Sequence, residues 1–293
     1  TDFSCIMANV IKIKKGLDIN LKGKASDVLL NGGKSDSYAI VPDYYNGIVP
    51  KVVAKVGEKV KAGSVLMIDK NRPEIKFVSP VSGEVTAVNR GEKRKVLSVV
   101  VKPEAQIEYE DFGKKNVASL KREEVKEAIL HAGMWPFIKQ RPYDIVASPA
   151  DEPRDIFVSA FYSAPLAPNF DFVVKGQEVD FQTGLDALAK LTDGKVYVGI
   201  RKGSSVSVKG VETVEVEGPH PAANVGVQIN HIKPINKGEV VWTVNPADVI
   251  VIGRLFNKGI ADFSRLVVIT GSETTERGYV KAIAGCTIAS LVD

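Results

Sequence analysis

The stretch Ser79-Pro-Val-Ser-Gly-Glu-Val-Thr-Ala-Val88 decides the first part of the fold, together with the earlier stretch Val56-Gly-Glu-Lys-Val-Lys-Ala-Gly-Ser-Val-Leu66. Both stretches lie in a region, 38–102, made of short β-branched segments that glycines and other turn residues interrupt. Such segments, separated by turn signals, are typical of short strands in an all-β unit. After 56–62 brings the chain round a turn, Gly63 permits the backbone angles that lead into the next strand.

Two β-rich halves in this order resemble lipoyl and biotinyl carrier domains, in which two similar halves form a flattened sandwich. We therefore expect a barrel-sandwich domain over 38–106, after a leader and extension over 1–37. The leader Thr1-Asp-Phe-Ser-Cys-Ile6 precedes a natural initiator, Met7, and lacks the basic and apolar regions of a secretory signal.

The hydrophobic period changes near Asn116. Ser119 is predicted to cap a helix whose first turn holds Glu123 and Glu124 and whose end is marked by Gly133. Further strands and helices then alternate along the chain, at 156–160 (strand), 181–191 (helix), 195–200 (strand), 241–244 (strand) and 246–257 (helix). This alternation predicts a Rossmann-like α/β domain over 107–263, with a mainly parallel sheet.

A new unit is predicted from Ser264, where two strands are followed by a glycine and the start of a helix. This order is typical of the beginning of a β-grasp domain of the soluble-ligand-binding type, here 264–293. Thirty residues cannot bury an independent core. We therefore expect a multi-domain α+β protein whose chain is truncated in its third domain.

Composition limits the possible functions. The chain of 293 residues carries a net charge of +4 and two cysteines, Cys5 and Cys286. Two cysteines cannot form a disulfide framework or supply the four ligands of an iron–sulfur cluster. The three histidines lack metal-ligand spacing. The most basic run, 90–95, contains a glutamate and no aromatic residue, so we expect neither a metal nor a nucleic-acid site.

Seven motifs in the right order make the chain similar to the family of A subunits of the Na+-translocating NADH:quinone reductase, the Nqr complex. The motifs are Ile11-Lys-Ile-Lys-Lys-Gly-Leu-Asp18, Asn89-Arg-Gly-Glu-Lys-Arg94, Arg154-Asp-Ile-Phe-Val-Ser-Ala160, Pro165-Leu-Ala167, Gly194-Lys-Val-Tyr-Val198, Glu217-Gly-Pro-His-Pro-Ala222 and Val249-Ile-Val-Ile-Gly-Arg-Leu-Phe256. The resemblance implies an oxidoreductase and translocase subunit in ubiquinone reduction by NADH and in sodium transport. Family members continue past residue 293, in agreement with the expected truncation.

The resemblance also implies the partners and the location: other Nqr subunits, integral membrane ones included, and the cytoplasmic face of the bacterial inner membrane, to which the protein is peripheral. The family is similar in architecture to the flavin-bearing, NADH-binding subunit of complex I and to the Rnf C subunit. Those relatives carry a glycine-rich loop after the first helix of the α/β domain.

In this chain the matching stretch, 131–143, has one glycine, two prolines and three aromatic residues. Bulky side chains and missing N–H donors close a phosphate cradle, and no other dinucleotide or P-loop motif occurs. We therefore expect no bound cofactor and no catalytic residue in this chain, with FMN, FAD and iron–sulfur centres in other subunits and quinone as substrate. The alternative is an NADH- and flavin-binding dehydrogenase subunit like the complex I relative.

The same stretch offers the candidate site residues for a quinone or a partner subunit: Trp135, Phe137, Lys139, Arg141 and Tyr143. The aromatic rings either fill the vacated pocket as core or line a cleft in which Lys139 or Arg141 donates to a quinone carbonyl.

Two residues outside this stretch also have alternative interpretations. His220, between two prolines, either binds a polar headgroup or stiffens a loop. Lys70 stands where a carrier domain presents its modified lysine, but Pro73 follows before the next strand. A proline there disturbs hairpin pairing, so we expect Lys70 to be unmodified.

Overall fold

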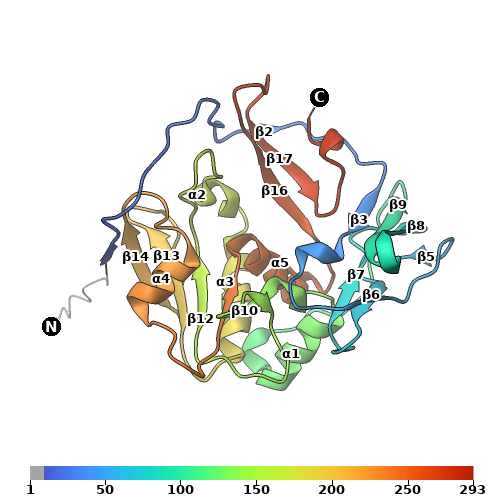
Figure 1. The fold of residues 1–293 in the computed structure, drawn as a ribbon, viewed down its shortest axis with the longest axis horizontal. Coiled ribbons are helices and arrows are strands. Elements are labelled where there is room, and N and C mark those ends of the chain that lie inside the picture. Colours follow the sequence, from blue (N-terminus) through green and yellow to red (C-terminus); the bar gives the residue numbers. More distant parts are fainter. Residues whose placement is uncertain (1–9, 293) are drawn as a thin grey trace.

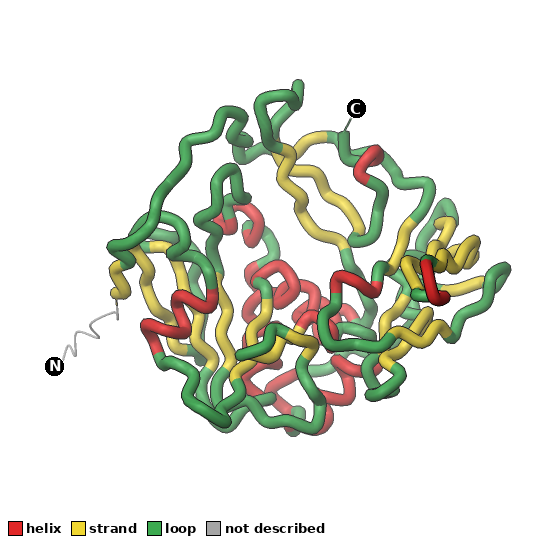
Figure 2. Tube along the Cα trace, viewed as in Figure 1, coloured by secondary structure: helices red, strands yellow, loops and turns green. Residues whose placement is uncertain are grey.

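The computed structural model describes residues 10–292, and their strands form four sheets (Figures 1 and 2). The predicted leader at 1–6, which contains Cys5, lies outside the described residues, as does Met7.

The predicted barrel-sandwich unit is confirmed as two facing sheets. One sheet has the order β3 (Tyr38–Ile40), β9 (Val96–Pro103), β8 (Gly83–Arg90) and β5 (Lys59–Val60). The other has the order β4 (Pro50–Val52), β6 (Val65–Asp69) and β7 (Lys76–Val78). Leu66 from the second sheet packs with Val85, Val99 and Val101 from the first in one fully buried cluster.

The α/β domain is built on a seven-stranded sheet whose central strands are parallel. They follow the order β14 (Glu212–Glu217), β13 (Val196–Arg201), β12 (Ile156–Ser159) and β15 (Val241–Val244). The chain runs outward from β12 to β14 and then returns to place β15 on the other side of β12. This reversal is a topological switch point, where open α/β sheets bind ligands at the carboxyl ends of their strands.

Two short strands make the sheet mixed. β10 (Ile138–Arg141) pairs antiparallel with β15, and β11 (Ile145–Val146) pairs antiparallel with β10. The prediction of a mainly parallel sheet is therefore correct, and the antiparallel edge begins directly after the 3-10 turn at 135–137.

Helices cover both faces of the sheet because alternate strand residues point to opposite sides. Ile156 and Val158 belong to the core beneath α3 (Glu178–Lys190) and α5 (Pro246–Lys258), whereas Phe157 packs with Ile229 of α4 (Val225–Ile232). The short helix α2 (Phe170–Val174) follows the loop after β12.

Helices α3 and α5 cross at two glycines. A Cβ atom added at Gly253 would lie 1.7 Å from the carbonyl oxygen of Asp180, and one added at Gly184 would lie 2.0 Å from that of Val249. Glycine is therefore required in both helices by backbone contact, against its low helix propensity.

The start of the first helix differs from the prediction. α1 (Arg122–His131) begins after Lys121, whose N–H donates to the side chain of Glu124 at 2.8 Å. Ser119 lies in a preceding 3-10 turn and donates to the carbonyl of Asn116, so its predicted role as the helix cap is wrong. The predicted end is correct, because Gly133 takes a left-handed conformation with φ of 70°.

The N-terminal segment joins the other sheets instead of forming a separate extension. β1 (Val10–Lys12) pairs parallel with β14 at one edge of the seven-stranded sheet. The chain then crosses the molecule to β2 (Leu29–Leu30), which pairs parallel with β17 (Gly278–Ile283) (Figure 1). Only the strand character of β1 was predicted from the sequence.

The predicted unit after 264 is a three-stranded sheet of β16 (Ser264–Ile269), β17 and β2. It is anchored to the α/β domain by Tyr279, whose ring lies 4.6 Å from that of Phe172 and whose hydroxyl accepts from the N–H of Asn169. Arg254 of α5, only 4% exposed, donates to the carbonyl of Ser264 at 2.7 Å.

Candidate functional site

The main candidate site is a cavity of about 820 Å³ at the carboxyl ends of β12 and β15, which we call the switch-point cavity. The polar and aromatic side chains that line it come from several units and include Tyr45, Phe137, Lys139, Arg141, Tyr162, Asn245, Asp248 and Arg265. The starts of α4 and α5 also border it. Its place agrees with the ligand position of open α/β folds.

Charged groups converge on this cavity. Arg265 Nη2 lies 3.1 Å from Asp248 Oδ1, and Arg141 Nε lies 3.3 Å from Asp144 Oδ1. Burial raises the pKa of Asp248, although the nearby charge of Arg265 acts in the opposite direction. Burial also lowers the pKa of Lys139, against the charges of Asp144 and Asp248. A lysine and a carboxyl that lose hydration in this way are the kind of groups found at functional sites.

Aromatic side chains line the same cavity. Burial raises the pKa of Tyr45 to about 12, with the charge of Asp248 adding to the effect. Burial likewise raises the pKa of Tyr162 to about 12, while its hydroxyl donates to Asn245 Oδ1 at 3.2 Å. The Lys139 ammonium lies 5.7 Å from the centre of the Tyr45 ring, and the Arg265 guanidinium lies 5.8 Å from that of Phe137.

Unpartnered polar atoms single out this cavity. In residues 10–292, the buried side-chain nitrogens and oxygens without a hydrogen bond are Arg141 Nε, Asp248 Oδ1 and Arg265 Nε, and all three residues line it. Arg141 Nε and Asp248 Oδ1 each have one ion-pair contact, but neither contact has the geometry of a hydrogen bond. A buried polar atom without a partner costs free energy, which a ligand with both acceptor and donor groups would recover.

The structure places three of the predicted site residues in this cavity. Phe137, Lys139 and Arg141 line it and are half-buried. Trp135 is 0% exposed, donates through Nε1 to the carbonyl of Ala147 at 2.8 Å and packs edge-on against Trp242. Trp135 is therefore core, and its assignment to a ligand cleft is wrong.

The two remaining predicted residues lie elsewhere. Tyr143 is 83% exposed and does not line the cavity. His220 lies in the loop before α4, where its N–H donates to Asp18 Oδ1 and its Nδ1 is 3.0 Å from Ser163 Oγ. These contacts agree with the interpretation that His220 stiffens the loop. His220 does not line the switch-point cavity with Phe137, Lys139 and Arg141.

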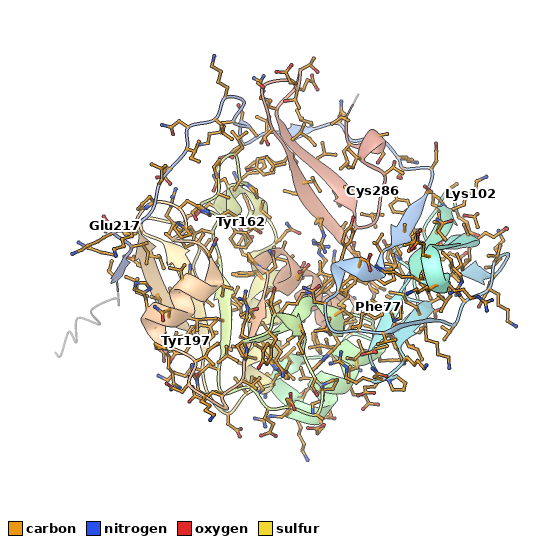
Figure 3. All side chains as sticks on the ribbon, in the orientation of Figure 1. Phe77, Lys102, Tyr162, Tyr197, Glu217 and Cys286 are labelled. Atoms are coloured by element: carbon orange, nitrogen blue, oxygen red, sulfur yellow. The ribbon has the colours of Figure 1, made fainter. Side chains whose placement is uncertain are left out.

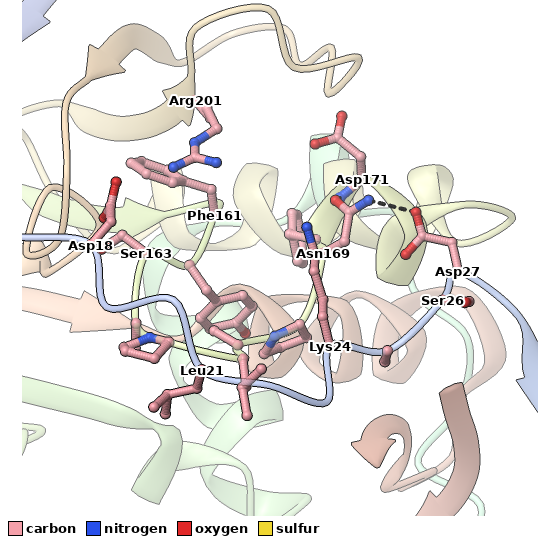
Figure 4. A pocket seen from close by; sticks show the side chains of 18 of the residues that line it. Asp18, Leu21, Lys24, Ser26, Asp27, Phe161, Ser163, Asn169, Asp171 and Arg201 are labelled. Carbon is pink, nitrogen blue, oxygen red and sulfur yellow. Dashed lines mark hydrogen bonds between the residues drawn. The ribbon is translucent and has the colours of Figure 1, made fainter. Parts of the chain in front are cut away.

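A second cavity of about 700 Å³ lies under the N-terminal segment 18–27, next to the loop after β12 (Figure 4). Its carboxylates already have partners. Asp18 accepts from the N–H of His220, Asp27 accepts from Asn169 Nδ2, and Asp171 accepts from Ser204 and Ser205. This cavity therefore offers a ligand fewer unmet hydrogen bonds than the switch-point cavity.

The region of Lys70 is held against the α/β domain. Asp69 is fully buried and pairs with Arg72 at 2.8 Å, and Arg72 also donates to the carbonyls of Val146 and Gly47. In a carrier domain the modified lysine stands at a free hairpin tip. These contacts therefore favour an unmodified Lys70, and the state of this lysine stays a prediction.

Sequence reasoning missed Tyr45, Tyr162, Asp248 and Arg265. Asp248 had a signal, since it is a carboxylate in the first turn of a helix whose buried residues are mostly apolar. That position is also an ordinary one for a carboxylate that stabilises the helix dipole. The other three lie on separate elements, and only the tertiary fold brings them together. Figure 3 labels Tyr162 among the side chains of the whole fold.

Two general features of the described residues bear on function. No helix in 10–292 is long and apolar enough to cross a membrane. In the same residues, no group of three or more His, Cys, Asp or Glu side chains could hold a metal ion.

Comparisons with known proteins give two family matches. Residues 11–104 match the NqrA N-terminal barrel-sandwich hybrid domain, and residues 120–261 match the NqrA second alpha/beta domain. The chain is 36% identical over 287 residues to the A subunit of the Na(+)-translocating NADH-quinone reductase of Neisseria meningitidis serogroup A, covering 96% of this chain and 64% of that protein.

The A subunits of the same enzyme from Hahella chejuensis and Vibrio atlanticus are each 36% identical over 289 residues, covering 97% of this chain and 65% of each relative. The chain thus spans a little less than two thirds of the length of these relatives. The second match covers most of the α/β unit, and the first covers the barrel-sandwich strands together with β2 and most of β1, which join other sheets.

Proposed function

This chain belongs to the NqrA family, and from that premise we propose that it is a cofactor-free subunit of a Na+-pumping NADH:quinone oxidoreductase that holds a quinone ring in the switch-point cavity. The related A subunits are named for this enzyme. Their name is consistent with the predicted partners, which are other Nqr subunits, integral membrane ones included. The chain's proposed location is a peripheral one, on the cytoplasmic face of the bacterial inner membrane.

The single observation that carries the proposal is the set of unpartnered buried atoms among aromatic walls. A quinone accepts hydrogen bonds at two carbonyl oxygens, and Arg141 Nε, Arg265 Nε and the Lys139 ammonium are the donors at hand. A quinol donates through its hydroxyls, and Asp248 Oδ1 is the acceptor at hand. The rings of Tyr45 and Phe137 supply flat apolar faces. The cavity thus offers contacts to both redox forms.

A binding experiment tests the site. We expect Lys139→Gln and Arg265→Gln each to weaken binding of a dimethoxy-methyl-benzoquinone by about tenfold or more, because a hydrogen bond to a charged group contributes about 1.5–3 kcal/mol. Isothermal titration calorimetry of the folded variants measures the effect. The control is Lys195→Gln, which removes an exposed lysine paired with Glu212 outside the cavity. Unchanged affinity in both cavity variants would contradict the site.

A spectrum tests the cofactor-free part of the proposal. We expect the purified protein to show no stoichiometric flavin or iron–sulfur absorbance. Trp135, in the stretch that resembles the glycine-rich loop of the flavin-bearing relatives, is fully buried, and the sequence supplies only Cys5 and Cys286 as thiolate ligands. A flavin spectrum at one equivalent would instead favour the alternative, an NADH- and flavin-binding dehydrogenase subunit.

A further inference from the structure

An apolar cavity of about 160 Å³ adjoins the switch-point cavity, and we call it the annex. The two share the lining residues Tyr44, Tyr45, Phe137 and Ala284. The annex lies where three units meet, since Ile40 and Phe77 come from the barrel-sandwich unit, Phe137 from the α/β domain and Ala284 from the C-terminal segment.

The residues that line the annex are mainly aliphatic and aromatic. Two edge-to-face aromatic pairs border it, Tyr45 with Phe77 at 4.9 Å and Phe137 with Phe263 at 6.0 Å. No residue that lines it is charged. An apolar group placed in a space of this kind would be removed from water and would gain van der Waals contacts with its walls.

The shared aromatics also fix the relation between the annex and the polar groups. Lys139 lies over the ring of Tyr45 and Arg265 over that of Phe137, so both donors lie next to rings that line the two cavities. A quinone ring held by these donors would therefore lie near the annex.

We propose that the annex receives the first part of the hydrocarbon chain of the bound quinone, so that this chain selects a prenylated or alkylated quinone over a chain-less one. The inference rests on the proposed function, because it needs a quinone ring in the switch-point cavity. It assigns Val41, Ile40 and Ala284 to recognition of the chain.

The experiment compares two probes, a dimethoxy-methyl-benzoquinone without a chain and its decyl derivative, each titrated by calorimetry into the protein. Burial of a few methylene groups at about 0.8 kcal/mol each predicts that the decyl compound binds at least about tenfold tighter. Val41→Phe, from the barrel-sandwich side, and Ala284→Leu, from the C-terminal side, place a larger side chain at the annex. In each we expect the ratio of the two affinities to fall to about one.

The control is Ile288→Phe, which adds a ring to the same C-terminal segment at a site that is 79% exposed and lines neither cavity. It should keep the ratio of the unmodified protein. Equal affinity for both probes in the unmodified protein would overturn the inference, even if neither variant folds. A ratio preserved in both folded variants would overturn it too. If neither probe binds the unmodified protein, the proposed function itself fails.

Discussion

Replacing Trp135 by alanine should destabilise the protein by about 3–5 kcal/mol, the range found when a large aromatic residue is removed from a core. The indole is fully buried and packs edge-on against Trp242, with ring centres 5.4 Å apart. Its removal also leaves the carbonyl of Ala147 without the N–H that it accepts in the structure. The cavity left by the indole and the lost hydrogen bond both lower the stability of the folded protein.

Urea denaturation followed by circular dichroism measures this effect. Tyr143→Ala is the matched control, because it removes an aromatic ring from the same stretch at a position that is 83% exposed, and it should change stability by less than about 0.5 kcal/mol. A Trp135→Ala protein that keeps its stability but loses quinone affinity would show that Trp135 is a ligand contact after all.

Replacing Asp155 by alanine should also destabilise the protein, by about 1.5–3 kcal/mol, because it removes a buried carboxylate that accepts hydrogen bonds from charged groups. Asp155 is 0% exposed at the start of β12. It accepts from Arg154 Nε at 2.7 Å and from the N–H of Lys195 at 3.0 Å, and Lys233 Nζ lies 2.8 Å away. Arg154 in turn donates to the carbonyls of Pro234 and Lys233.

The same carboxylate makes stability depend on pH. Burial alone would raise the pKa of Asp155, but hydrogen bonds from Lys233, the N–H of Lys195 and Arg154 outweigh burial and lower it below 3.8. A lowered folded-state pKa stabilises the protein above the unfolded value, and this contribution is lost as the pH falls through the folded value. We therefore expect the stability difference between the native protein and Asp155→Ala to shrink below about pH 4.

Denaturation curves at several pH values check this expectation. Glu212→Gln is the control, since Glu212 forms an exposed ion pair with Lys195 and such pairs contribute at most about 1 kcal/mol. A difference between the native protein and Asp155→Ala that stays constant from neutral pH to pH 3 would show that Asp155 has an ordinary pKa.

The sequence predicted the elements whose pattern is local. The helix predicted at 246–257 is observed at Pro246–Lys258, because a proline at its start, a buried apolar stripe and Gly259 at its end all agree. The strand predicted at 156–160 is observed at Ile156–Ser159 for the same kind of reason, a short β-branched run that is buried on both faces.

Elements and contacts set by distant parts of the chain were not predicted. Nothing in the local pattern of Trp135 distinguishes a ring in a cleft from a ring in the core. The outcome depends on Ala147, which returns beside it after β11 and accepts its N–H. The pairing of β1 with β14 and of β2 with β17 depends likewise on which sheet edges are open in the folded protein. The same reason explains why only part of the site was predicted. Lys139 and Arg141 lie in one stretch of the sequence and were predicted together, whereas Asp248 and Arg265 come from other stretches and were not.

The crossing of the N-terminal segment has a consequence for how the chain folds. Leu29 pairs with Tyr279, and Val10 with Glu215, so the first strands find their neighbours among parts of the chain that are synthesised much later. Contacts between residues far apart in the chain slow folding, because a long loop must close before they form. Until β14 and β17 have been synthesised, β1 and β2 lack their pairing strands. Unpaired strands of this kind associate readily with other chains, so these two segments are open to such association until their partners have formed.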